Sequence, residues 1–286
     1  MILNRYLIEQ ENAKEKAERL SRYKDYTFRV ANDFDMKNPP MMRRVEIETF
    51  NICNGRCTFC PANIYADKRT HIKMSESTYK KIVLDLKELG YSGRLSLHSN
   101  NEPFLDDRII EFAQFARKNL PNTIIDMCTN GTVMGIKKFN AIIGYVDEMI
   151  IDNYNDSLEI NPEIREIEKR INEDEVLNKK VTISLRKQNE VLRSRGGQAP
   201  NRKDKNTWDC SCILPFIQMV IRSSGEVSLC CNDVYGTVTL GDMNTQSVWE
   251  VWTSDKANHY RNLIRKGRSN FMLCEYCDES HDIKRV

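Results

Sequence analysis

Several features that mark whole classes of protein are missing from this chain of 286 residues. No uninterrupted apolar run approaches membrane-spanning length, and the first residues carry Glu9, which does not fit a secretory leader. The 43 basic side chains are balanced by 41 acidic ones, and a net charge of +2 gives no reason to expect nucleic acid as the obligatory partner. Internal repeats and low-complexity segments are absent. We therefore expect a cytoplasmic protein with an ordinary packed core.

Cysteine, in contrast, is present ten times. Without a secretory leader, so many cysteines are typical of metal ligands in a reducing compartment. Three of them, Cys53, Cys57 and Cys60, lie in one short loop directly after the apolar run 45–50. Such a loop can hold three corners of an iron–sulfur cubane while the fourth iron keeps no protein ligand. An open iron can chelate a small molecule and drive chemistry on it, so the spacing predicts an enzyme.

Other interpretations of this loop fit less well. A zinc site usually has two Cys-x-x-Cys pairs or cysteine and histidine pairs, and the three-residue gap between Cys53 and Cys57 does not match them. A disulfide framework requires an oxidising compartment and usually a small domain. A structural or redox-sensing iron–sulfur protein needs a fourth ligand, and no further cysteine lies near residues 53–60.

From residue 44 onwards, short β-rich runs alternate with helical segments, which is the signature of βα units around a parallel sheet. We expect strands near 44–50, 94–98, 123–128, 148–152 and 180–186, a further strand near 190–193, and helices near 75–89, 107–119, 136–143 and 162–176. The predicted fold class is α/β, a partial (β/α) barrel of about five to six parallel strands. Its carboxyl strand ends would face a wide cleft, where parallel α/β folds build their sites.

We expect three parts in the chain: an N-terminal helical extension over 1–43 with an amphipathic helix near 4–25, the partial barrel over 44–200, and a small hairpin-plus-helix domain over 201–286. Six of the ten cysteines fall in the last part. The run 217–229 predicts a β-hairpin turning at Ser224 and Gly225, which would bring Cys212 and Cys230 to the same end. After a helix near 247–266, Cys274 and Cys277 would complete the site. Spacing alone does not distinguish a four-thiolate zinc site from a fully ligated cluster.

With these two cysteine sets, the sequence resembles members of the radical S-adenosylmethionine (SAM) superfamily. Its members carry the same three-cysteine spacing with an aromatic residue before the third cysteine, where Phe59 stands here. The resemblance implies that the open iron of a [4Fe–4S] cluster binds S-adenosylmethionine and that one electron splits it into a 5′-deoxyadenosyl radical. The C-terminal set resembles the SPASM or shortened twitch extension, which implies an auxiliary [4Fe–4S] cluster on Cys212, Cys230, Cys274 and Cys277. An external one-electron reductant, such as flavodoxin or ferredoxin, is implied as well.

The same resemblance assigns cofactor contacts to the ends of predicted strands. Most members have Gly-Gly-Glu-Pro after the second strand, whereas this chain has Asn100, Asn101 and Glu102 before Pro103. These three residues are expected at the methionyl group, Thr129 and Asn130 at the ribose, and Ser184 and Arg186 at the carboxylate or ribose. The asparagines also fit ordinary βα turns, in which they are common residues.

The segments 193–197 and 212–215 resemble twitch-domain dehydrogenases that oxidise aminocyclitols, which implies a carbohydrate, cyclitol or aminoglycoside-type substrate. A cluster sealed by four cysteines has no open iron, so its simplest task is to accept an electron in a two-electron oxidation of a carbinol. By this resemblance Arg195 contacts the substrate, as a clamp rather than a base, because its pKa is too high for a base. Those enzymes have an acid where Asn232 stands here, so Asp233 becomes the expected acid.

Two other reactions stay open. A radical epimerase would use a thiol as hydrogen donor, and Cys231 or Cys210 could serve because neither is needed as a ligand. Peptide-modifying SPASM enzymes often carry a leader-binding domain, for which the 43 residues before the first predicted strand are too few. Cys128, at the end of a β-rich run, is expected to be a core residue.

Overall fold

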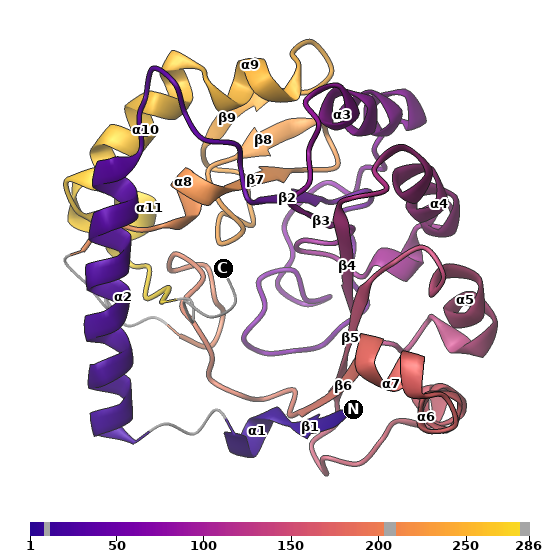
Figure 1. Ribbon diagram of the computed structural model, residues 1–286. Coiled ribbons are helices and arrows are strands. Elements are labelled where there is room, and N and C mark those ends of the chain that lie inside the picture. The colour runs from indigo at the N-terminus through magenta and orange to yellow at the C-terminus, as the bar shows by residue number, and fades with distance from the viewer. Residues whose placement is uncertain (9–11, 203–209, 281–286) are drawn as a thin grey trace.

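The computed structural model describes residues 1–8, 12–202 and 210–280 (Figure 1). Within these ranges, nine strands form one sheet in the order β1-β6-β5-β4-β3-β2-β7-β8-β9. The strands are β1 (Ile2–Asn4), β2 (Arg44–Ile47), β3 (Arg94–Ser96), β4 (Ile124–Thr129), β5 (Glu148–Tyr154), β6 (Val181–Arg186), β7 (Gln218–Ile221), β8 (Glu226–Ser228) and β9 (Thr239–Asp242). All pairs from β1 to β7 are parallel, whereas β8 pairs antiparallel with both of its neighbours. The predicted α/β class with a mainly parallel sheet is confirmed.

The helices that connect the parallel strands lie along the outer side of the curved sheet (Figure 1). They are α3 (Glu76–Glu88), α4 (Ile109–Asn119), α5 (Gly135–Ile142), α6 (Arg165–Asn172) and α7 (Glu175–Lys180), with 3-10 turns at Pro103–Leu105 and Pro162–Ile164. Side-chain caps fix where two of them begin: Ser75 accepts from the Thr78 amide, and Asp174 accepts from two amides of α7. Asp174 also splits the helix predicted over 162–176, because its cap starts a new helix there.

The N-terminal segment contributes a strand as well as helices. Strand β1 pairs with β6, with Ile2 opposite Ile183, and is followed by α1 (Arg5–Ile8) and α2 (Ala13–Asp33). Asn12 and Glu15 form a reciprocal capping box that starts α2. The strand predicted near 190–193 is absent, because the Glu190 carboxylate accepts from Lys187 N and Arg186 Nη1 and folds the chain into a turn directly after β6. Strand β1 takes that edge position instead.

The C-terminal part continues the same sheet. Strand β7 pairs with β2, and Arg44 lies opposite Gln218. Strands from both sides of the expected domain boundary at residue 200 therefore belong to one sheet. Around it lie α8 (Leu214–Ile217), α9 (Val248–Trp252), α10 (Asp255–Arg265), a 3-10 turn at Arg268–Asn270 and α11 (Met272–Glu275). Ser254 caps α10 through the Ala257 amide, so the single helix predicted near 247–266 is two helices. Strand β9 was not predicted.

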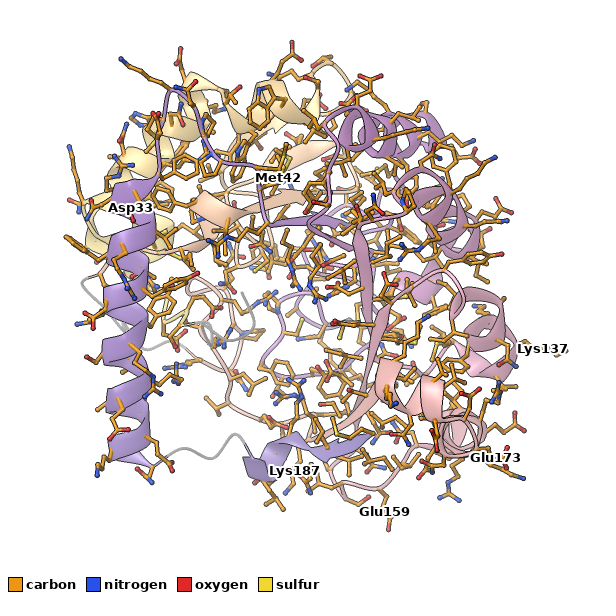
Figure 2. All side chains as sticks on the ribbon, in the orientation of Figure 1. Asp33, Met42, Lys137, Glu159, Glu173 and Lys187 are labelled. Atoms are coloured by element: carbon orange, nitrogen blue, oxygen red, sulfur yellow. The ribbon has the colours of Figure 1, made fainter. Side chains whose placement is uncertain are left out.

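The apolar core fills the space between the sheet and its helices. Met42 lies inside it, whereas Lys137, Glu159 and Glu173 project from the rim (Figure 2). The core extends to the C-terminal end of α2, where the C-cap residue Phe34 packs edge-on against Phe216 at a centroid distance of 5.3 Å. In the part of the chain that the structure describes, no helix combines the length and the apolarity needed to cross a membrane.

Candidate functional site

The three-cysteine loop leaves the carboxyl end of β2 and is held by its own backbone. Cys60 N donates to the Cys57 carbonyl at 3.1 Å, and the Asn63 amide group donates to the carbonyls of both Cys57 and Cys60. Thr58 N bonds the Gln188 carbonyl, which ties the loop to the segment after β6. Asn63 is a structural residue that the sequence pattern did not indicate.

The loop has room for an inorganic cluster beside its sulfur atoms. A Cβ added to Gly55 would lie 3.2 Å from the Sγ of Cys53 and 3.9 Å from that of Cys57, so a side chain at this position would occupy the space between the thiols. Burial raises the pKa of Cys53 to about 12 and also raises that of Cys57. Iron would therefore have to displace the protons, as it does when a thiolate binds metal.

A cavity of about 780 Å³ opens over this loop at the carboxyl ends of the parallel strands. The residues that line it include Cys53, Cys57, Phe59, Cys60, His98, Asn100, Asn101, Glu102, Cys128, Thr129, Asn130, Asp152, Tyr154, Arg186 and Arg195. Most of the predicted cofactor residues thus line one cavity. Ser184 is the exception: it is fully buried and does not line the cavity, so we do not retain it as a cofactor contact.

Glu102 is held at the cavity wall by three donors. Its carboxylate accepts from the Thr129 hydroxyl at 2.7 Å, the Asn130 amide at 2.7 Å and the Phe104 amide at 3.1 Å. Burial nevertheless raises its pKa, because the hydrogen bonds only partly offset the loss of water. A cationic ammonium group arriving in the cavity would favour the carboxylate form, as the predicted contact with the methionyl amino group requires.

The two asparagines that replace glycines have different partners. Asn100 donates to the Cys231 carbonyl at 3.1 Å and accepts from Arg195, so it joins the barrel to the C-terminal part. Asn101 accepts from the Ser99 amide, while its own buried Nδ2 has no hydrogen-bond partner among the described residues. That amide group therefore fits an acceptor on a bound cofactor, such as a carboxylate.

Arg195 reaches the cavity from a strained turn. Its φ of 52° is followed by φ values of 63° at Gly196 and 79° at Gly197, so three consecutive residues are left-handed. Only the glycines adopt this region without cost. A Cβ at Gly196 would lie 2.9 Å from the Leu273 side chain, which shows how closely the turn packs on α11. Strain held at a cavity wall is typical of functional positions.

The structure corrects the prediction for Asp233. Its carboxylate accepts from the amides of Thr237 and Val238 and from the Thr237 hydroxyl, and it does not line the cavity. Asp233 therefore stabilises its own loop. The preceding Asn232 donates to Glu279 at 3.0 Å, and Glu279 in turn forms an ion pair with Arg193. Sequence reasoning did not find Glu279, because nothing in its local sequence marks it.

Two further residues line the cavity: His98, which the sequence did not indicate, and Cys128, which was expected in the core. His98 accepts the Cys128 amide proton on Nδ1 at 3.0 Å, and burial lowers its pKa to about 4, so the ring is neutral and carries its proton on Nε2. Cys128, expected in the core, lines the cavity, and its thiol donates to Asp152 at 3.2 Å.

The second cysteine set lies around the predicted hairpin. Strands β7 and β8 are antiparallel, and Cys212, Cys230, Cys274 and Cys277 are all buried. After burial itself, the neighbouring cysteines raise the pKa of Cys230 and of Cys274, because nearby negative charge disfavours ionisation. The carbonyl of Cys231 accepts from Asn100 and Arg195. None of the ten cysteines, all of which are among the described residues, forms a disulfide bond.

Among the described residues, no three His, Cys, Asp or Glu side chains lie close enough to hold one metal ion. The cysteines that hold a cubane surround the cluster and bind different irons, so they do not converge on one point.

Comparison with known proteins agrees with both sites. A model of the radical SAM superfamily matches residues 47–181, and a model of the iron–sulfur cluster-binding SPASM domain matches residues 210–278. The chain belongs to the radical SAM superfamily. Membership with a SPASM domain implies S-adenosylmethionine, a radical SAM [4Fe–4S] cluster and an auxiliary iron–sulfur cluster, which the residues described above fit.

Individual relatives of this radical SAM protein have low sequence identity to it. The S-adenosyl-L-methionine-dependent 2-deoxy-scyllo-inosamine dehydrogenase of Niallia circulans is 24% identical over 236 residues, which is 82% of this chain and 92% of the relative. The crystal structure of BtrN in complex with AdoMet and 2-DOIA matches with a TM-score of 0.72 at 23% identity, over 85% of this chain and 98% of that one. Streptococcus suis SuiB bound to precursor peptide SuiA matches with a TM-score of 0.52 at 12% identity, over 96% and 78%. The structural matches establish a shared fold.

Anaerobically reconstituted protein is expected to carry about eight irons per chain, as two [4Fe–4S] clusters. Replacing Cys53, Cys57 and Cys60 together by Ala should leave about four irons and abolish reductive cleavage of S-adenosylmethionine, because only the auxiliary set remains. Iron and sulfide analysis with Mössbauer spectroscopy measures both. About four irons with stoichiometric zinc in the unmodified protein would contradict the assignment of the second set.

Glu102→Gln should weaken S-adenosylmethionine binding by about 1.5–3 kcal/mol, roughly ten- to a hundredfold in Kd, because it removes the charge that faces the ammonium group. Isothermal titration of the reconstituted protein measures the change. Glu148→Gln is the matched control, since that carboxylate pairs with Arg94 at the amino end of β5. Equal affinities for the two variants would move the methionyl pocket away from Glu102.

Proposed function

We propose that this protein is a radical SAM dehydrogenase that oxidises a carbinol of a cyclitol, sugar or aminoglycoside-type small molecule by two electrons. The observation that carries the proposal is the arrangement around the Arg195–Cys231 contact. The cavity with the three-cysteine loop lies on one side of this contact. On the other side, the residue before Cys231 is Cys230, which belongs to the buried set of four cysteines. The named activity of the 24% identical dehydrogenase supports the same reaction.

In this proposal, bound S-adenosylmethionine and its cluster supply the 5′-deoxyadenosyl radical that removes hydrogen from the carbinol carbon. The Arg195 guanidinium holds the carbinol oxygen and favours its deprotonation, since a cation stabilises developing negative charge. The Nε2–H of His98 is a second donor for that oxygen. Asp152 lines the cavity close to His98 and is the carboxylate that we assign to accept the proton.

The reaction then requires an acceptor for the electron left on the substrate and a donor for the electron that starts each turnover. One hydrogen atom would leave with the deoxyadenosyl group, Asp152 would accept one proton, and an auxiliary cluster held by the second cysteine set would take the remaining electron. The electron that starts each turnover comes from outside the chain, and a flavodoxin or ferredoxin in the cytoplasm is the reductant that we propose. The substrate itself is a small molecule, because the cavity of about 780 Å³ suits a cyclitol beside the cofactor.

Epimerisation is the second candidate, because three cysteines have no proposed ligand role. Cys231 contacts Arg195 through its carbonyl but does not line the cavity, and Cys210 lies near Arg268 beside the auxiliary set. Cys128, in contrast, does line the cavity. The structure therefore adds Cys128 to the hydrogen donors that an epimerase could use. A peptide substrate has the weaker support, since the peptide-bound SuiB structure matches only as a fold at 12% identity.

The reaction type is testable with candidate cyclitols and aminocyclitols in deuterated water. We expect a product lighter than the substrate by two hydrogens, with one 5′-deoxyadenosine formed for each product, because the oxidation releases a proton and an electron. Mass spectrometry of an anaerobic incubation measures both. A product of unchanged composition with deuterium at an inverted carbon would instead establish an epimerase.

The thiol variants Cys128→Ala, Cys231→Ala and Cys210→Ala test the same choice from the side of the enzyme. If the enzyme is a dehydrogenase, each variant should keep substantial turnover wherever iron content is normal, because no thiol returns hydrogen. Product formation is measured together with 5′-deoxyadenosine formation. Loss of product with persistent deoxyadenosine in one variant alone would identify that thiol as a hydrogen donor and overturn the dehydrogenase.

A further inference from the structure

Two buried side chains, Tyr23 and Arg268, connect helix α2 to the auxiliary cysteines. Each is 1% exposed. The Tyr23 hydroxyl donates to the Sγ of Cys212 at 3.7 Å and accepts from Nη2 of Arg268 at 2.9 Å. Tyr23 lies in the N-terminal segment, outside both ranges that the family models match, and Arg268 lies inside the SPASM range. The contact thus joins this chain's own N-terminal helix to a site of the family.

Arg268 is a buried cation without a carboxylate partner in the residues that the structure describes. Its guanidinium donates to the carbonyls of Cys277 at 3.1 Å and Glu279 at 2.6 Å, and its Nε–H has no hydrogen-bond partner among the described residues. Its electrostatic neighbours are the thiols of Cys212, Cys277 and Cys210 together with Tyr23. Burying a lone charge is costly. A cluster held by four thiolates carries negative charge and would balance this cation.

We propose that Tyr23 and Arg268 are positioning residues that raise the reduction potential of the auxiliary cluster. Reduction adds one electron to the cluster, and no bond forms or breaks. Hydrogen bonds to sulfur and a nearby cation in a medium of low dielectric stabilise the reduced, more negative form more than the oxidised form. The pair thereby favours transfer of the electron from the substrate to the cluster. The proposal depends on the proposed function only for the source of that electron.

A purely structural role makes a different prediction. In that case Arg268 only ties two carbonyls of the C-terminal tail together, and Tyr23 only packs α2 against the C-terminal part. Removing the Tyr23 hydroxyl would then alter stability or cluster content but leave the potential where it was. The potential of an intact cluster therefore separates the two roles.

The test is Tyr23→Phe in the full chain, in a background with Cys53, Cys57 and Cys60 replaced by Ala so that only the auxiliary cluster reports. We expect an EPR-monitored redox titration to give a more negative midpoint potential at unchanged iron content. Tyr26→Phe is the matched control: Tyr26 lies on the same helix, and its hydroxyl accepts from Arg43. Its potential should equal that of the parent. Equal potentials for Tyr23→Phe and the parent, with about four irons in each, would overturn the proposal.

A second measurement covers the case in which the background does not retain its cluster. In the two-cluster enzyme with S-adenosylmethionine bound, an exchangeable proton coupled to the reduced auxiliary cluster should be visible by ENDOR and should disappear in Tyr23→Phe. Persistence of that coupling in the variant would contradict the assigned hydrogen bond from Tyr23 to Cys212. Because both readouts are made without substrate, a shifted potential in an enzyme that oxidises no carbinol would support this inference and contradict the proposed function.

Discussion

The parallel pairing of β2 with β7 is the constraint on which both cysteine sites depend. Its register places Arg44 opposite Gln218 and Ile47 opposite Ile221. Strand β2 leads into the three-cysteine loop, and β7 leads through a hairpin into β8, which ends two residues before Cys230. Backbone hydrogen bonds of one sheet therefore fix the two sites relative to each other. A reaction in which one site generates a radical and the other removes an electron requires such a fixed relation, because misplacement of reacting groups is costly.

The departure from the usual glycines of the superfamily has a structural use in this chain. At Asn100 the side chain bonds the Cys231 carbonyl and accepts from Arg195, so it crosses the junction between the barrel and the SPASM part. At Asn101 the side-chain oxygen caps the Ser99 amide and leaves an amide N–H for a ligand. Glycines could provide neither contact. Asn100 thus couples this part of the cavity lining to Arg195.

The elements that could be predicted are those with local signals. The three-cysteine loop, the hairpin before Cys230 and most parallel strands follow from spacing and apolar runs, which depend on neighbouring residues only. What could not be predicted depends on contacts distant in sequence. Strand β1 exists because β6 offers an unpaired edge, and Asp233 is removed from the cavity by amides four and five residues ahead. Cys128 has the local pattern of a core residue, and only Asp152 on the next strand turns it into a cavity thiol.

The N-terminal segment explains how an open barrel can enclose radical chemistry. A partial barrel leaves one side of its cavity exposed, whereas a reactive intermediate needs protection from water and side reactions. Strand β1 extends the sheet at β6, and Arg5, Lys16 and Arg19 of the following helices line the cavity on that side. The same segment then carries Tyr23 to the auxiliary cysteines. Residues before the family core therefore line the cavity and also contact the auxiliary cysteines, so in the proposed reaction the N-terminal segment would serve both sites.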